Sequence, residues 1–208
     1  MKTLICTLFL ILAFPLRALT VPHLQVGDVL LLSLKCYECR VIESETESLF
    51  SHSGVIIKDE LGNIRVAQSL GKLDHFSYEE FTKNITPGTF VHVYRPFEFS
   101  AKSALEITFL EKIMLKVFNE KYKGAPFDSP YKWDNYNQYG EELLYCSEFI
   151  AKFLDNFLTE KTILAPISYS KHYDYWYRYF KGEVPEGELG NSPASFSRDH
   201  RFEFIGTI

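Results

Sequence analysis

The sequence has no excess of positive charge, no internal repeat and no low-complexity stretch. Its 22 lysines and arginines are outnumbered by 27 aspartates and glutamates, which gives a net charge of −5. Proteins that bind a phosphate backbone usually present a basic face, so nucleic acid is a poor candidate ligand. The 46% hydrophobic and 24% charged residues are typical of globular proteins and exclude disorder or collagen-like repeats. Without an evident linker, residues 21–208 are predicted to form a single domain.

Long hydrophobic runs are also scarce, and the longest lies at the beginning of the sequence. Lys2 precedes apolar residues 4–16, which Arg17 then interrupts. A transmembrane helix needs roughly 20 apolar residues, so residues 1–20 are predicted to be a secretory signal peptide that is removed. An uncleaved anchor is the alternative, because Leu16 stands where the cleavage site usually has a small residue. The protein is therefore expected in the periplasm, in the cell envelope or outside the cell.

Cysteine is scarce as well. The sequence has four cysteines, and Cys6 belongs to the predicted signal peptide. The odd number that is left, Cys36, Cys39 and Cys146, indicates that one thiol stays free. Cys36 and Cys39 have the C-x-x-C spacing of redox and zinc sites, but no second pair is present to complete four zinc ligands. We expect a local disulfide or two loop thiols there, and no bound zinc.

Hydrophobic patterning predicts an α+β fold with an antiparallel sheet and helices packed on it. Short apolar segments separated by turns predict a meander of strands in the first half. These strands are expected at 29–32, 54–57, 64–68 and 89–94. Apolar residues at helical spacing then predict helices over 103–122, opened by a capping box, and over 145–158. The tail is expected to be mostly irregular, with a last strand at 202–205 that could close the sheet.

Cys146 lies at the predicted start of the second helix. The unpaired N–H groups and the positive end of the helix dipole at such a position favour the thiolate, so we expect a lowered pKa for Cys146. The Cys146 backbone N–H is expected to form part of an oxyanion hole. A buried structural cysteine is the alternative, because free cysteine is often buried.

A cysteine nucleophile needs a base, and His52 is the best placed of the six histidines. It stands at the entry to the predicted strand 54–57, and Gly54 beside it lets another segment approach closely. Gln68 lies on the strand expected to pair with this one, where its amide oxygen could accept a bond from the imidazole Nδ1–H. An amide stabilises an imidazolium less than a carboxylate would. His52 and Gln68 could instead be structural polar residues of the sheet.

Several short motifs occur in a fixed order along the chain. They are GDV at 27–29, SHSGVI at 51–56, GAPFD at 124–128, YCSEF at 145–149 and SP at 192–193. This succession resembles the YiiX/YebB branch of the NlpC-type papain-like cysteine hydrolases. In these circularly permuted relatives the histidine strand precedes the cysteine helix, the reverse of the order in papain.

The resemblance implies a permuted papain-like fold with a catalytic cysteine at a helix N-terminus. It implies that Cys146 is the nucleophile, His52 the general base and Gln68 the third catalytic position, with no cofactor and no metal. Relatives often carry an acidic residue or another polar group in place of Gln68, so glutamine leaves the imidazole less polarised. Asp28 would fix the conformation at the start of its strand.

Residues beside these motifs are the expected substrate contacts. They are Tyr145, Glu148, Asp128 and Trp133. Glu148 would contact a substrate amine or cap its helix, and residues 124–128 would shape the loop before that helix. Aromatic residues could wall a cleft or pack onto the domain. These aromatic residues are Tyr131, Trp133, Tyr136, Tyr139 and those within 173–177.

The resemblance also implies an activity. The protein would cleave an amide or ester through an acyl-enzyme on Cys146, with a cell-wall peptide or a lipid or acyl conjugate of the cell envelope as substrate. Such substrates leave room for peripheral contact with a membrane surface. Two alternatives stay open: an acyltransferase that uses the same cysteine and histidine, and a binding module that has kept the fold but lost turnover.

Overall fold

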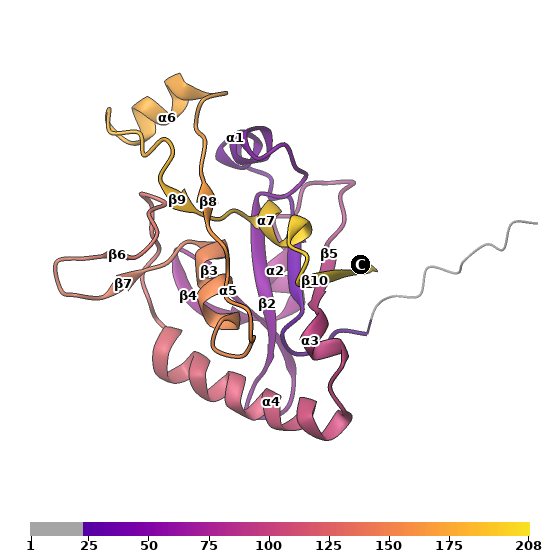
Figure 1. The fold of residues 1–208 in the computed structure, drawn as a ribbon. Coiled ribbons are helices and arrows are strands. Elements are labelled where there is room, and N and C mark those ends of the chain that lie inside the picture. Colours follow the sequence, from indigo (N-terminus) through magenta and orange to yellow (C-terminus); the bar gives the residue numbers. More distant parts are fainter. Residues whose placement is uncertain (1–22) are drawn as a thin grey trace, which may run out of the picture.

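The structure is a computed structural model that describes residues 23–208. The predicted signal peptide, residues 1–20, lies outside the described residues. A six-stranded sheet with the order β10-β5-β1-β2-β3-β4 forms the centre of the fold, and all neighbouring strands are antiparallel (Figure 1). Its strands are β1 (Val29–Leu32), β2 (His52–Lys58), β3 (Ile64–Leu70), β4 (Lys72–Phe76), β5 (His92–Pro96) and β10 (Phe202–Thr207). Two short ribbons pair β6 (Asn135–Tyr136) with β7 (Glu142–Leu143) and β8 (Ala165–Pro166) with β9 (Leu189–Gly190).

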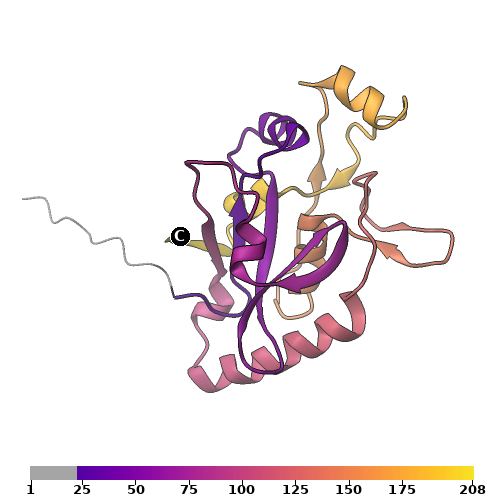
Figure 2. The same cartoon turned by 180° about the vertical axis from the view of Figure 1, so that it is seen from behind.

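Helices cover both faces of the sheet. They are α1 (Tyr37–Glu45), α2 (Tyr78–Thr82), α3 (Phe97–Ser100), α4 (Ala104–Val117) with a π-helical turn at Phe118–Tyr122, α5 (Cys146–Leu154), α6 (Tyr173–Tyr179) and α7 (Pro193–Arg198). Helix α5 packs against β2 and β3, with α4 beyond it at the lower end of the sheet in Figure 1. Helix α2 lies on the opposite face, which Figure 2 turns toward the viewer. Helices α1 and α6 lie together at the upper end.

Alternation along the strands creates two hydrophobic cores. Leu31 and Val55 belong to the core beneath α4 and α5. Leu30 and Ile56 belong to the core on the other face, together with Phe81 of α2. Successive side chains of a strand point to opposite faces, so the side chain of residue 53 starts toward α5 and that of residue 52 toward α2.

The start of β1 is fixed by a glycine and a buried carboxylate. Gly27 has a φ of 84°, and a Cβ there would come within 2.2 Å of the Phe99 ring. The Asp28 carboxylate is fully buried and accepts hydrogen bonds from Arg95 Nε at 2.6 Å and from the Gln25 N–H at 2.8 Å. Burial raises the pKa of Asp28, although Arg95 and the Gln25 N–H oppose the shift. The expectation that Asp28 sets the conformation of this strand start agrees with these contacts.

The predicted architecture of an antiparallel sheet with packed helices is confirmed. Strands β1, β2 and β3 are adjacent as the meander predicted, but the strand expected at 89–94 is β5, which lies on the other side of β1, and β10 forms the outer edge of the sheet beside β5. The second predicted helix is shorter than expected, because the chain leaves the helix after Leu154 and makes turns through Leu158. Patterning missed β4 and α1, and the tail contains two short helices, α6 and α7.

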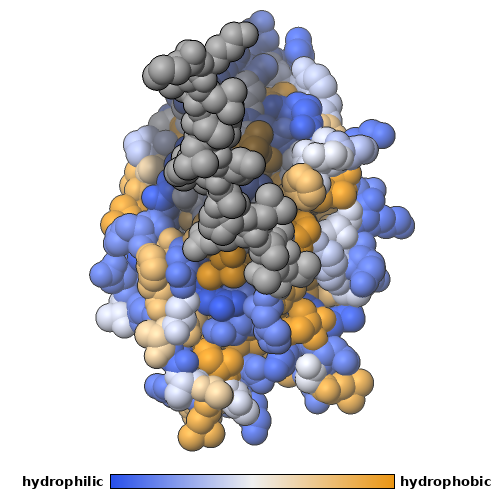
Figure 3. Space-filling model, turned by 90° about the vertical axis from the view of Figure 1, so that its right-hand side faces the viewer, coloured by the Kyte–Doolittle hydropathy of each residue, from blue (hydrophilic) through white to orange (hydrophobic). Residues whose placement is uncertain are grey.

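The surface is mixed in character. On the face drawn in Figure 3, hydrophobic and hydrophilic side chains alternate in small groups. Among the helices of residues 23–208, none has the length and apolar character that crossing a membrane requires.

Candidate active site

The N-terminus of α5 is anchored to the sheet and left open at its cap. Ser69 Oγ of β3 donates to the Leu144 carbonyl at 2.6 Å, and the Leu144 N–H donates to the Pro126 carbonyl at 3.0 Å. Tyr145, the N-cap residue, is extended and makes no side-chain capping bond. The first N–H groups of a helix have no partner within it, so those of α5 are free to serve the Cys146 sulfur and a bound ligand.

The sulfur of Cys146 lies where β2 and β3 part from one another. The pairing between these strands runs from Lys58–Ile64 to Val55–Ala67, so Ser53 and Ser69 lie beyond its end. At this opening the Ser53 hydroxyl and the backbone N–H groups of Ser53, Ser147 and Cys146 are the polar groups around the Cys146 sulfur, and they act to lower the pKa of its thiol. The sulfur therefore sits beside the residue that follows His52.

His52 and Gln68 meet at the same end of the two strands. His52 Nε2 lies 2.6 Å from Gln68 Oε1, and the His52 side chain is only 3% exposed. An amide oxygen can only accept, so Nε2 carries the proton and Nδ1 is left as the acceptor nitrogen. The pairing of His52 with Gln68 occurs as expected, but it uses Nε2 in place of the predicted Nδ1. The Phe81 ring lies 5.7 Å from the imidazole centroid and helps to hold its plane.

Burial keeps both groups neutral at rest. It raises the pKa of the Cys146 thiol, although the Ser53 hydroxyl and the backbone N–H groups around the sulfur oppose the shift. It lowers the pKa of His52 to about 4, and the bond to Gln68 only partly compensates. The expectation of a lowered pKa for Cys146 is therefore wrong, because removing the sulfur from water outweighs the donors of the helix N-terminus. The cavity is therefore lined by a neutral thiol and a neutral imidazole.

The pKa of His52 predicts how folding stability depends on pH. A histidine in the unfolded chain titrates near 6.5, whereas burial lowers the pKa of His52 to about 4. Between these values the unfolded chain binds the extra proton, so stability is complete above about pH 6.5 and falls toward pH 4, by roughly 3 kcal/mol. Urea denaturation across this range should show the loss in the wild type but not in His52→Gln. The control His75→Gln, at a half-buried position on β4, should behave like the wild type. Parallel curves for His52→Gln and the wild type would contradict the assignment.

A cavity of about 650 Å³ opens at this end of the molecule, and both Cys146 and His52 line it. Its walls come from the loop before α1 and α1 itself, from the loop before α5, and from the segment that carries α6. The aromatic residues that line it are Phe127, Tyr131, Tyr145, Tyr169, Trp176 and Tyr179. Aliphatic residues Leu34, Ile42, Leu70 and Ile167 complete its apolar surface. The nucleophile candidate is thus at the wall of a largely apolar, aromatic pocket.

The structure brings only one of the four predicted substrate contacts to this cavity. Tyr145 lines it, and its hydroxyl accepts the Asn191 N–H at 3.2 Å. Asp128 is fully buried and shapes its own loop by accepting from the Lys132 N–H at 2.6 Å and from Asn135 Nδ2 at 2.7 Å. Asp128 is not among the residues that line the cavity, and its bonds within the loop agree with the expectation that residues 124–128 shape it.

Glu148 and Trp133 also point elsewhere. Glu148 is fully buried, and its Oε1 accepts from the Asp134 N–H at 3.0 Å and from Lys152 Nζ at 2.9 Å. Burial raises the pKa of Glu148 to about 7, with Lys152 opposing the shift. Trp133 packs against the core under α5, and Lys152 Nζ lies 4.8 Å from its ring centroid. Both residues fasten the loop before α5 to the helix, and neither is among the residues that line the cavity.

The same group is the one place in the described part of the chain where three acidic or metal-binding side chains converge. Ligand atoms of Asp134, Glu142 and Glu148 lie within 4.8 Å of one another. Lys152 Nζ bonds to these carboxylates at 2.6, 2.5 and 2.9 Å. Burial alone would lower the pKa of Lys152, but the three carboxylates raise it overall. The ammonium already supplies the positive charge, so the residues do not fit a metal ion, and no chemical step is assigned to one.

Part of the cavity wall was not foreseen. Helix α1 contributes Glu38, Ile42 and Glu45. The hydroxyl of Tyr131, an expected cleft residue, donates a short hydrogen bond to Glu38. The Glu45 carboxylate accepts from the His172 N–H at 2.7 Å and from Trp176 Nε1 at 3.1 Å, which ties α6 over α1. Of the other aromatic residues expected in the cleft, Trp176 lines the cavity. Tyr136 in β6 and Tyr139 in the turn between β6 and β7 are exposed to solvent.

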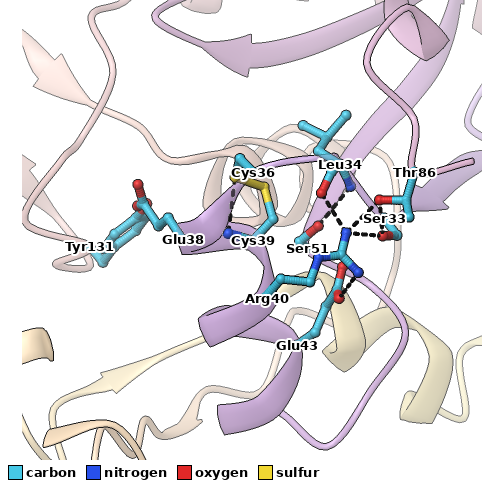
Figure 4. Close-up of a disulfide and its surroundings, with 10 residues drawn as sticks. All are labelled: Ser33, Leu34, Cys36, Glu38, Cys39, Arg40, Glu43, Ser51, Thr86 and Tyr131. Atoms are coloured by element: carbon cyan, nitrogen blue, oxygen red, sulfur yellow. Dashed lines mark hydrogen bonds and ion pairs between the residues drawn. A yellow bond between two sulfur atoms is a disulfide. The ribbon is translucent and has the colours of Figure 1, made fainter.

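Cys36 and Cys39 form a disulfide at the start of α1, the first of the two alternatives that the sequence left open (Figure 4). Both residues line the cavity. In Figure 4 the Glu38 side chain extends from this turn toward Tyr131, and Arg40 extends to the opposite side. Arg40 Nη2 donates to the Leu34 carbonyl and Ser33 Oγ, each at 2.7 Å. Among residues 23–208, Cys146 is the free cysteine.

Comparison with known proteins gives a fold match. No family model matches the chain. No curated protein matches its sequence. Among solved structures, the metalloprotein yiiX from Escherichia coli O157:H7, described as DUF1105, superposes with a TM-score of 0.73 at 18% identity, covering 88% of this chain and 97% of that one. The chain therefore shares the fold of yiiX over nearly its whole described length.

Proposed function

We propose that this protein is an exported thiol hydrolase with a circularly permuted papain-like fold, in which Cys146 is the nucleophile and His52 the base. The observation that carries the proposal is the placement of Cys146 at the uncapped N-terminus of α5, in one cavity with a His52 ring held by Gln68. A nucleophile, its base and a third group that orients the base are the elements of a catalytic triad. The fold shared with yiiX supports the arrangement of sheet and helices alone, and the permuted order of the histidine strand and the cysteine helix is part of the proposal.

The resting protonation states set the order of events. A substrate carbonyl bound beside Cys146 is attacked by the sulfur while the thiol proton passes to His52 Nδ1, and the carbonyl electron pair moves to oxygen. The backbone N–H groups of Cys146 and Ser147 lie at the sulfur and can donate to that oxyanion. Collapse breaks the bond to the leaving group, which takes the proton from Nδ1. Water then gives a proton to Nδ1 and attacks the thioester, which releases the acid and restores the thiol.

The cavity supports a substrate with a bulky apolar or aromatic part next to the scissile bond. Its aromatic and aliphatic lining would bury such a group. We propose an amide or ester of the cell envelope, either a cell-wall peptide or a lipid or acyl conjugate, and peripheral membrane contact would bring the second kind within reach. Acyl transfer, with an amine or alcohol in place of water, would follow the same first half-reaction.

A binding module without turnover is the second candidate. The neutral, buried pair of Cys146 and His52 favours it, because neither group is activated before a ligand arrives. An activity-based probe screen separates the candidates. The mature protein is incubated with acyl, dipeptide and lipid-ester probes, and labelling is mapped by mass spectrometry. If the protein is a hydrolase, at least one probe class should label Cys146. If it is a binding module, probes can occupy the cavity but no covalent product should form on Cys146.

A further inference from the structure

The disulfide between Cys36 and Cys39 has no part in the proposed hydrolysis, yet both residues line the cavity. The two cysteines are only three positions apart. The chain entropy that a disulfide removes from the unfolded state decreases with the length of the loop it closes, so this disulfide stabilises the fold less in this way than one between distant segments would. This contribution to folding stability does not explain why the disulfide lies in the wall of the cavity, which points to a chemical role.

The two sulfur-bearing residues are unequal in the way that exchange chemistry requires. Cys36 is exposed, whereas Cys39 is 6% exposed. Cys36 is also the N-cap of the nine-residue helix α1, and its sulfur accepts the Cys39 N–H at 3.0 Å. Helix N-termini and C-x-x-C motifs both favour a thiolate. An attacking thiol can therefore reach Cys36, and a thiolate on Cys36 would be stabilised, while Cys39 is kept back as the resolving thiol.

The surroundings indicate a small partner. The disulfide lies in the wall of the cavity, which Tyr131 and residues of α6 also line, so a small thiol that enters the cavity meets it there. Figure 4 shows the disulfide at the turn that enters α1, with Glu38 directed away from it toward Tyr131. The carboxylate of Glu38 thus does not lie against the sulfur atoms, where it would repel an incoming thiolate.

We propose that Cys36 and Cys39 form a thiol–disulfide exchange site for a small-molecule thiol, distinct in chemistry from the hydrolytic site that shares the cavity. A thiolate RS⁻ attacks the Cys36 sulfur, the bond between Cys36 and Cys39 breaks, and Cys39 leaves as a thiolate that takes up a proton. A second RS⁻ attacks the R sulfur of the mixed disulfide, which forms RSSR and releases Cys36. Two electrons pass from the two thiols to the protein, and the reverse sequence reoxidises the pair.

Trapping the mixed disulfide tests this proposal. All variants carry Cys146→Ala, which removes the free thiol and makes the result independent of the hydrolase activity. After incubation of the mature protein with oxidised glutathione, Cys39→Ser should carry one glutathione on Cys36 by intact mass. The matched variant Cys36→Ser should carry at least tenfold less, because Cys39 is buried. Equal adducts on the two variants, or none on either, would overturn the proposal.

A second measurement uses both cysteines and does not depend on the folding of the single variants. The Cys146→Ala protein is equilibrated in buffers of graded reduced and oxidised glutathione, then alkylated and weighed, with circular dichroism as the record of folding. If the pair is an exchange site, the disulfide should be converted reversibly into two thiols, with the uptake of two electrons, while the protein stays folded. A pair that stays oxidised throughout, or that is reduced only when the protein unfolds, would show it to be a structural disulfide.

Discussion

Replacing Cys146 by alanine is expected to abolish covalent labelling by acyl probes and to lower hydrolysis by roughly 10³-fold or more, because Cys146 is the free thiol of the cavity and the proposed nucleophile. The fold should survive, since the N-terminus of α5 is held by backbone and Ser69 contacts that do not involve the sulfur. Turnover of the best substrate from the probe screen, together with the urea midpoint of the variant, measures both effects.

The matched substitution for this experiment is Cys146→Ser, which keeps a nucleophilic atom and a proton but has a far less acidic group. It should retain the fold and lose most of the activity. If Cys146→Ala hydrolyses substrate at the wild-type rate, the cysteine is not the nucleophile. If both variants unfold, the buried thiol is a core residue and the loss of activity carries no information about chemistry.

Gln68→Glu is expected to move the acidic limb of the pH–rate profile upward. Burial lowers the pKa of His52 to about 4, and the neutral amide of Gln68 compensates only in part. A carboxylate at the same place would accept the Nε2 proton and stabilise the imidazolium. The limb of kcat/KM that reports protonation of His52 should therefore lie near pH 4 in the wild type and move toward 6.5 in Gln68→Glu.

Gln68→Leu completes the test of Gln68 as a positioning residue. It removes the acceptor but keeps a similar volume, so the imidazole loses its fixed tautomer and kcat should fall by roughly 10²-fold with little change in KM. A purely structural role would move the stability of the protein but leave the position of the acidic limb in Gln68→Glu unchanged. That result would remove Gln68 from the site.

The part of the site that was predictable lies in local geometry. His52 and Gln68 flank a hairpin whose turn and apolar pattern are visible in the sequence, and the observed register, Val55 opposite Ala67, places residues 52 and 68 diagonally on one face. The position of Cys146 at a helix start follows from the apolar spacing behind it. These features depend on neighbours within a few residues or on one strand pair.

The predictions that failed have two kinds of cause, one in the local geometry of a helix and one in contacts between distant parts of the chain. Glu148 follows Cys146 by two positions, and residues of a helix are offset by about 100° each, so the two side chains point to nearly opposite sides. The pKa of Cys146 could not be predicted, because the burial that raises it depends on segments far away in the sequence, such as the β2 segment that brings Ser53 to the sulfur. Helix α1 escaped detection because its exposed face is polar and only Cys39 and Val41 are buried.

The central claim is that His52 accepts the thiol proton of Cys146, and the alkylation rate of Cys146 as a function of pH tests it most directly. The wild type, His52→Ala and the control His75→Ala are treated with iodoacetamide between pH 5 and 9, and the Cys146 peptide is followed by mass spectrometry. With His52 as acceptor, proton transfer within the pair does not depend on pH across this range. The wild type and His75→Ala should show a nearly flat rate, and His52→Ala a slower rate that rises about tenfold per pH unit toward the raised pKa of the thiol. Rates that rise steeply and coincide in all three proteins would contradict the pairing of the two groups.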